Sequence, residues 1–119
     1  MQSIARHKTI AEVERWLGAS LPPEYVAFIC THEEGLIGER VLLYAAESII
    51  ECNETYETKV YCPGYLTIGD DSGGRAVVIS ANGPFGQVYL VDHGYMCTDG
   101  FELLPLGFTN WVAVQCPVE

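Results

Sequence analysis

The spacing of apolar residues changes halfway along the chain, and this change constrains the fold more than any other feature of the sequence. In the first half, apolar residues recur every three or four positions, as in helices that bury one face. In the second half, short β-branched or aromatic runs are separated by turn residues, which indicates antiparallel hairpins. The expected helices are 9–17, 22–32, 46–57 and 108–115, and the expected strands are 41–44, 65–68, 76–80 and 87–91. Helices first, strands next and one closing helix predict an α+β domain.

The ends of the first two helices carry local signals. Thr9 and Glu12 have capping-box spacing, so the first helix is expected to begin there, and Gly18 is a natural stop. Pro22 and Pro23 fit only the first turn of a helix, because the N–H groups that proline lacks are not needed there. These signals place two helices ahead of the first strand.

Length and composition fit one folded domain, residues 1–119. The chain is 49% hydrophobic and 18% charged, which is too apolar for a disordered chain. The longest uninterrupted apolar runs have six residues, whereas a helix needs about 20 to span a bilayer. The amino end also lacks the apolar stretch of a signal peptide. We therefore expect a cytoplasmic protein without a membrane partner.

Acidic residues greatly outnumber basic ones. The chain has 16 Asp and Glu against 6 Lys and Arg, a net charge of −10. Such a domain repels phosphate backbones, which argues against nucleic-acid binding, and it attracts basic proteins. Glu47, Glu51 and Glu54 are spaced at i, i+4 and i+7, so one stripe of the 46–57 helix is expected to be acidic.

The five cysteines indicate neither a disulfide framework nor a metal site. They lie at positions 30, 52, 62, 97 and 116, an odd number without any CxxC spacing. Paired metal ligands and secreted disulfide scaffolds both require other patterns. We expect reduced cysteines that pack as small apolar residues, no metal and no cofactor.

The segment Gly69-Asp70-Asp71-Ser72-Gly73-Gly74 is the most distinctive string in the chain. Asp-Ser-Gly-Gly occurs around the nucleophile of chymotrypsin-like proteases, but that chemistry needs a histidine and a buried carboxylate on two barrels. Gly-Asp-Asp occurs at polymerase metal sites, which need a much larger domain. We expect a strand-to-strand turn instead, in which Gly69, Gly73 and Gly74 supply positive φ and the two aspartates bond their own backbone. Exposed at a loop tip, the two carboxylates would also form a local negative patch.

Two further groups of residues bear on function. Asp70, Asp71, Asp92 and His93 suit a divalent cation chemically, although turn chemistry also explains Asp92-His93-Gly94. Tyr56, Tyr61, Tyr65 and Tyr95 lie near the ends of expected elements. Tyrosine is favoured at binding surfaces, although it is also common at core margins.

The order of several short motifs resembles the SUKH superfamily, the Smi/Knr-like domains. The motifs are Leu17-Gly18, Leu21-Pro22 with Tyr25 and Phe28, Leu43-Tyr44 with Glu47 and Ile49, Asn53 with Tyr56, Tyr65-Leu66 with Gly69-Asp70-Asp71 and Gly73-Gly74, Val88-Tyr89, Asp92-His93-Gly94, and Phe108 with Trp111. They span residues 9–114. Two positions depart from the family pattern: Glu33-Glu34-Gly35 replaces a common Asn-Gly pair, and Arg75 replaces an acid.

The resemblance implies a single α+β domain with a curved, mostly antiparallel sheet and helices packed against it. Bacterial members are mostly immunity proteins that neutralise a cognate toxin, often a nuclease, and fungal relatives act as scaffolds. We therefore expect a non-enzymatic protein that binds a basic toxin domain. The alternatives are an intracellular regulatory or scaffold module, and a small enzyme or ligand-binding domain that uses Asp70, Asp71 and His93. The expected partner-binding residues are Glu33, Glu34, Glu39, Asp70, Asp71, Asp92 and Tyr65.

Overall fold

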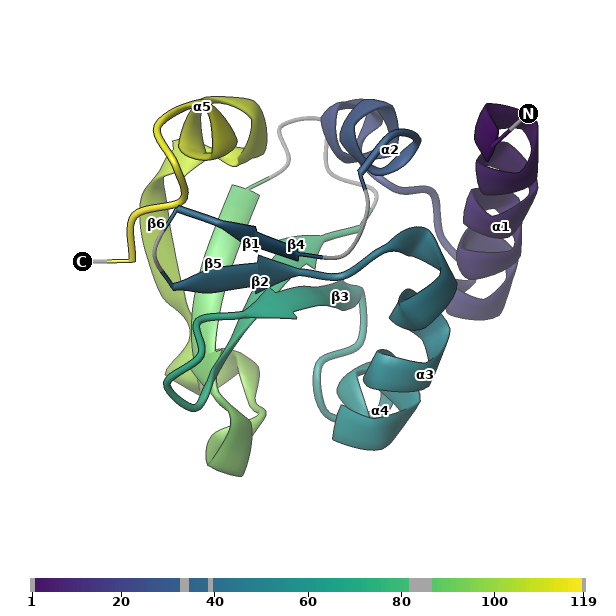
Figure 1. Ribbon diagram of the computed structural model, residues 1–119. Coiled ribbons are helices and arrows are strands. Elements are labelled where there is room, and N and C mark those ends of the chain that lie inside the picture. The colour runs from purple at the N-terminus through teal and green to yellow at the C-terminus, as the bar shows by residue number, and fades with distance from the viewer. Residues whose placement is uncertain (1, 33–34, 39, 82–86, 119) are drawn as a thin grey trace.

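The computed structural model describes residues 2–32, 35–38, 40–81 and 87–118, with side chains from residue 9 onward. The α-helices are α1 (Gln2–Leu17), α2 (Pro23–Ile29), α3 (Ala46–Tyr56), α4 (Thr58–Tyr61) and α5 (Phe108–Ala113). Two short 3-10 helices, η1 (His93–Tyr95) and η2 (Thr98–Gly100), connect the last two strands. The termini lie at opposite sides of the view in Figure 1.

Six strands form one antiparallel sheet in which each strand pairs with its neighbours in sequence. The strands are β1 (Gly35–Ile37), β2 (Val41–Leu43), β3 (Tyr65–Asp70), β4 (Arg75–Ser80), β5 (Gln87–Asp92) and β6 (Glu102–Gly107). Figure 1 shows the strand direction turning from nearly horizontal at β2 to nearly vertical at β5, as expected for a twisted sheet. The α+β class, the single domain and the antiparallel sheet predicted from the sequence are confirmed.

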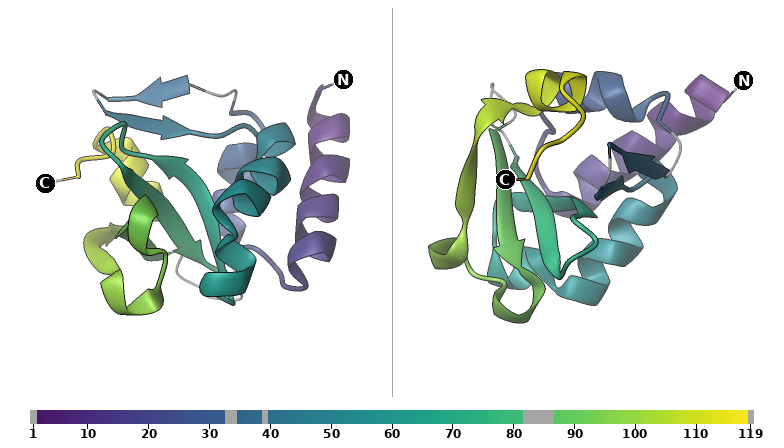
Figure 2. Two further views of the ribbon diagram at one scale, coloured as in Figure 1. Left: turned by 90° about the horizontal axis from the view of Figure 1, so that it is seen from below. Right: turned by 60° about the vertical axis from the view of Figure 1, so that its left-hand side comes forward.

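Helices α1, α2, α3 and α5 cover one face of the sheet and share a single hydrophobic core with it (Figure 2). The alternation along the strands explains the arrangement: Leu66 and its cross-strand partner Ile79 point into this core, as do Ile68 on β3 and Val77 on β4. Trp111, Tyr25 and Phe108 are among the largest fully buried side chains. Burying one such side chain stabilises the fold by about 1.5–3 kcal/mol.

The other face of the sheet carries a smaller core beneath the η1–η2 segment. Its buried members are Cys62, Ala76, Val78, Val91 and Met96. Tyr65 packs here, edge-on to Tyr89 and Phe101 at ring-centroid distances of 5.7 and 4.8 Å. Tyr65 is therefore half-buried in an aromatic cluster of three rings at the start of β3.

Several element boundaries differ from the sequence predictions. Helix α1 begins at Gln2, so Thr9 lies inside it and the predicted capping box is wrong. Gly18 ends α1 with φ +79°, as predicted. Two strands were not predicted, β1 and β6, and both lie at sheet edges. Pro105 in β6 lacks an N–H donor, which an edge strand tolerates and a central strand does not.

Candidate partner-binding site

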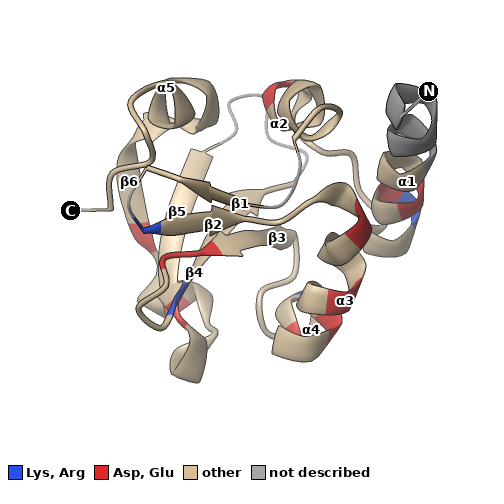
Figure 3. Ribbon diagram, viewed as in Figure 1, with Lys and Arg blue, Asp and Glu red and all other residues tan. Residues whose placement is uncertain are grey.

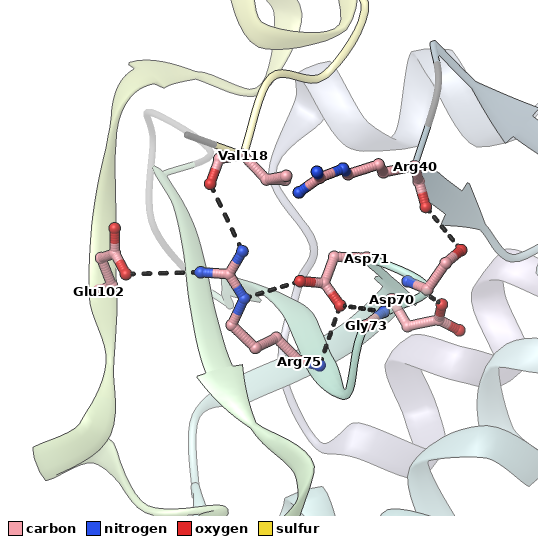
Figure 4. Close-up of polar contacts among 8 residues, drawn as sticks. Arg40, Asp70, Asp71, Gly73, Arg75, Glu102 and Val118 are labelled. Atoms are coloured by element: carbon pink, nitrogen blue, oxygen red, sulfur yellow. Dashed lines mark hydrogen bonds and ion pairs between the residues drawn. The ribbon is translucent and has the colours of Figure 1, made fainter.

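Asp71 is built into the turn between β3 and β4. Only 5% of the residue is exposed. Its Oδ1 accepts hydrogen bonds from the backbone N–H groups of Gly73, at 2.8 Å, and Arg75, at 3.0 Å. Its Oδ2 accepts one from Nε of Arg75 at 2.7 Å (Figure 4). The prediction that Asp71 lies exposed at a loop tip is wrong, because the turn folds back on its own carboxylate.

Arg75 neutralises this carboxylate and ties the turn to its surroundings. Its Nη1 lies 3.7 Å from a carboxylate oxygen of Glu102, and its Nη2 donates to the carbonyl of Val118 at 3.5 Å. Burial by itself raises the pKa of Asp71, but the backbone hydrogen bonds from Arg75 and Gly73, together with the guanidinium, hold that pKa below its usual range. The basic residue that replaces the family's usual acid thus removes one charge from the acidic surface.

The three glycines of this segment have different roles. Gly74 has φ +97°, as predicted for a tight turn. Gly69 is required by close approach instead, since a Cβ there would clash with the carbonyl oxygen of Leu42 and lie 2.9 Å from Cδ2 of Leu43. Ser72, rather than Gly69 or Gly73, supplies the other positive φ of the turn, at 63°. The expectation of positive φ is therefore wrong for Gly69 and Gly73.

Asp70 stays half-buried beside the turn and takes part in a polar chain. Its Oδ1 accepts from the N–H of Ser72 at 2.9 Å, and its Oδ2 accepts from the Tyr44 hydroxyl at 3.1 Å. Burial raises the pKa of Tyr44, with smaller effects from hydrogen bonding to Tyr56 and from the negative charge of Asp70. Asp70 is thus linked through Tyr44 to the carboxyl end of α3.

Asp92 and His93 lie at the same end of the sheet. Cross-strand pairing places Asp70 opposite Ala76 and Asp92 opposite Arg75, so the two aspartates flank the start of β4. Asp92 accepts a hydrogen bond from the N–H of Gly94 at 2.7 Å, which confirms the expected turn chemistry. The His93 ring packs against Tyr56 at 4.4 Å.

The structure therefore brings together only part of the predicted partner-binding set. Asp70, Asp71 and Asp92 share one end of the sheet, whereas Tyr65 begins β3 and lies about 17 Å from Asp70 at the rise of an extended strand. Glu33, Glu34 and Glu39 lie outside the described residues.

A groove that sequence reasoning missed lies next to the three aspartates. It is lined by Thr55–Glu57 and Tyr61 on one side and by residues 93–97 on the other, with a volume of about 530 Å³. Tyr61 and Tyr95 are 55% and 57% exposed. The clustering of tyrosines at element ends was the available signal, but the sequence does not reveal that α4 and η1 face each other.

Exposed carboxylates continue from this groove along α3. Glu47, Glu51, Glu54 and the αL residue Glu57 are all exposed, and Figure 3 shows the acidic positions along α3. Within the described part of the chain, no cation pairs with Glu51, Glu54 or Glu57. Ile49 and Asn53 occupy the buried side of the helix. The predicted acidic stripe is therefore present on the surface.

Neither a metal centre nor a membrane-spanning helix emerges from the described residues. Among them, no three His, Cys, Asp or Glu side chains gather in a way that could hold a metal ion. No helix in the described ranges is both long and apolar enough to cross a bilayer.

Comparison with known proteins supports the resemblance seen in the sequence. A search of curated proteins finds no match to the chain. A family model described as the SMI1/KNR4 family (SUKH-1) matches residues 5–111, from within α1 to within α5. The match includes every strand of the sheet, and we conclude that the chain belongs to the SMI1/KNR4 family (SUKH-1).

Proposed function

We propose that this protein is a bacterial immunity protein that binds a cognate protein toxin in the cytoplasm and blocks its active site, without any catalytic step of its own. The observation that carries this proposal is the pair of exposed carboxylates of Glu51 and Glu54 on α3 of a SUKH-1 domain, for which the described part of the chain offers no cation partner. A nuclease is the toxin class that fits best, because an enzyme that grips phosphates presents a basic cleft.

The charge of the domain supports rapid capture of such a toxin. The net charge of −10 creates a field that steers a basic partner into contact and raises the association rate. Asp71 is paired with Arg75, whereas Glu51, Glu54 and Glu57 have no cation partner within the described part of the chain and remain available to a basic partner. Binding energy would then come from desolvated contacts at the centre of the interface.

The test is co-expression with the product of the adjacent gene. An immunity protein is expected to rescue cells from that product and to form a stable stoichiometric complex with it on gel filtration. If the product of the adjacent gene is toxic and this protein neither binds nor neutralises it, the proposal is contradicted. A harmless neighbour would favour an intracellular regulatory or scaffold module instead.

Charge-removing variants test the contribution of α3. The double variant Glu51→Gln/Glu54→Gln is expected to slow association with the toxin about threefold or more at low salt, with a much smaller effect at about 0.5 M salt, where screening is strong. The matched control is Glu12→Gln/Glu102→Gln, which removes the same charge from α1 and β6. Equal slowing by both variants would assign the effect to net charge rather than to α3.

A further inference from the structure

The groove between α4 and η1 combines aromatic rings with negative charge. Tyr61 from α4 and Tyr95 from η1 border it from opposite sides, and more than half of each side chain's surface is exposed. Tyr56 and His93 join the two sides through their packed rings. Tyr95 lies against Gly100, where an added Cβ would come within 2.9 Å of its ring, so its position depends on that close approach.

Two carboxylates, Glu57 and Asp99, lie near these rings. Glu57 lines the groove, and Asp99 is close enough to Tyr95 to contribute, after the larger effect of Cys97, to raising the pKa of that tyrosine. None of the groove-lining residues is Lys or Arg. Lys59, the basic residue of α4, donates to the carbonyl of Trp16 at 2.6 Å and lies over that indole ring.

We propose that this groove receives an arginine side chain of the partner protein, held between the rings of Tyr61 and Tyr95 with Glu57 as its counter-charge. Arginine fits better than lysine because its planar guanidinium stacks on aromatic rings and binds carboxylates through paired hydrogen bonds. The inference rests on the proposed function only in taking the partner to be a basic protein. It places a partner contact on α4 and η1, outside the predicted partner-binding set of Glu33, Glu34, Glu39, Asp70, Asp71, Asp92 and Tyr65.

The experiment uses the full chain and a defined probe, the peptide acetyl-Gly-Arg-Gly-Arg-Gly-Arg-Gly-amide. Its binding is followed by two-dimensional NMR of ¹⁵N-labelled protein, which detects weak complexes residue by residue. A second peptide carries citrulline in place of arginine, so that shape is kept and charge is lost. We expect shifts confined to residues 55–61 and 92–99 with the arginine peptide, and none there with the citrulline peptide.

Variants separate the groove from general acidity. Tyr61→Ala and Tyr95→Ala are each expected to weaken peptide binding about two- to fivefold, the size of an exposed cation–π contact. Tyr95→Phe keeps the ring and should bind as the parent does. Val114→Ala, which truncates another exposed apolar residue just after α5, should leave binding unchanged.

Two results would overturn the inference: equal shifts with the arginine and citrulline peptides, or unchanged affinity in both tyrosine-to-alanine variants. The toxin assay separates this inference from the proposed function. If the protein neutralises its toxin and Tyr61→Ala/Tyr95→Ala binds that toxin as tightly as the parent, only the groove assignment fails. If the groove binds the arginine peptide but the protein does not neutralise the product of the adjacent gene, only the proposed immunity function is contradicted.

Discussion

Replacing Asp71 with alanine tests the central polar contact of the β3–β4 turn. The change removes three hydrogen bonds, two from backbone N–H groups and one from the Arg75 guanidinium. A hydrogen bond to a charged group contributes about 1.5–3 kcal/mol when its partner cannot reach water. Gly73 is exposed and the Arg75 side chain is 32% exposed, so water replaces part of what is lost. We therefore expect Asp71→Ala to lower the free energy of unfolding by about 2–3 kcal/mol.

The assay is urea denaturation at pH 7, followed by circular dichroism. With an m-value of about 1–3 kcal/mol/M, the midpoint should fall by roughly 0.7–3 M while m stays constant. Asp71→Asn keeps an acceptor for the two backbone N–H groups and loses only the ionic contact, so its expected cost is about 1–2 kcal/mol. Glu12→Gln removes an exposed charge and should change stability by less than about 0.5 kcal/mol.

The pH dependence follows from the lowered pKa of Asp71. Because the folded pKa lies below the unfolded value of about 3.9, this carboxylate stabilises the fold fully above that value. The contribution is lost as pH falls through the folded pKa. The stability difference between the parent protein and Asp71→Asn should therefore be constant from pH 6 to 7 and shrink below about pH 4. A cost for Asp71→Ala no larger than for Glu12→Gln, or a difference that grows on acidification, would refute the reasoning.

Three further outcomes follow from buried contacts. Asn53→Leu should lower the free energy of unfolding, measured by urea denaturation, by about 2–4 kcal/mol. The side-chain amide of Asn53 donates to the carbonyl of Thr67 on β3 and accepts from its N–H, and the variant would leave both of these backbone groups buried without partners. Gly69→Ala should lower the free energy of unfolding by about 2 kcal/mol or more, because the added Cβ would clash with the backbone of β2. At Gly73 an added Cβ would make only ordinary van der Waals contacts, so Gly73→Ala should lower it by less than about 1 kcal/mol. Burial raises the pKa of Cys116 to about 12, so iodoacetamide at pH 8 should label it far more slowly than the partly exposed Cys97. Mass spectrometry of labelled peptides measures this, and equal labelling of the native protein would contradict the burial.

The central strands and most helices could be predicted because local patterns and tertiary packing agree there. β3, β4 and β5 are hydrophobic runs bounded by turn residues, and α2 and α3 present apolar stripes. The edge strands carry weaker signals: β1 has only three residues, and β6 contains Pro105. An edge strand needs partners on one side only, so a short or proline-containing segment suffices.

The sequence predicted several of the residues at the candidate site, but not how these residues are arranged in space. The turn chemistry of Asp92 and the acidic stripe of α3 depend on neighbours within a few residues, so the sequence determines them. The burial of Asp71 depends on the path of the turn, and its partner Arg75 also contacts Glu102 and Val118. Tyr56 and His93 are 37 positions apart in the printed sequence, and no local pattern indicates that their rings pack together.

By itself, the sequence determined the α+β class, the order of most elements, the excess of negative charge and the resemblance to the SUKH superfamily, because these depend on residue type and short-range spacing. Only the tertiary structure decided which of those charges remain available. Folding places Arg75 against Asp71 and thereby neutralises that carboxylate, while it leaves Glu51, Glu54 and Glu57 in solvent beside exposed tyrosines. The physical reason is that burial and ion pairing depend on the path of the backbone in three dimensions: Arg75 is only four positions from Asp71, but the folding of the turn decides that they meet, and Arg75 then also contacts Glu102 and Val118.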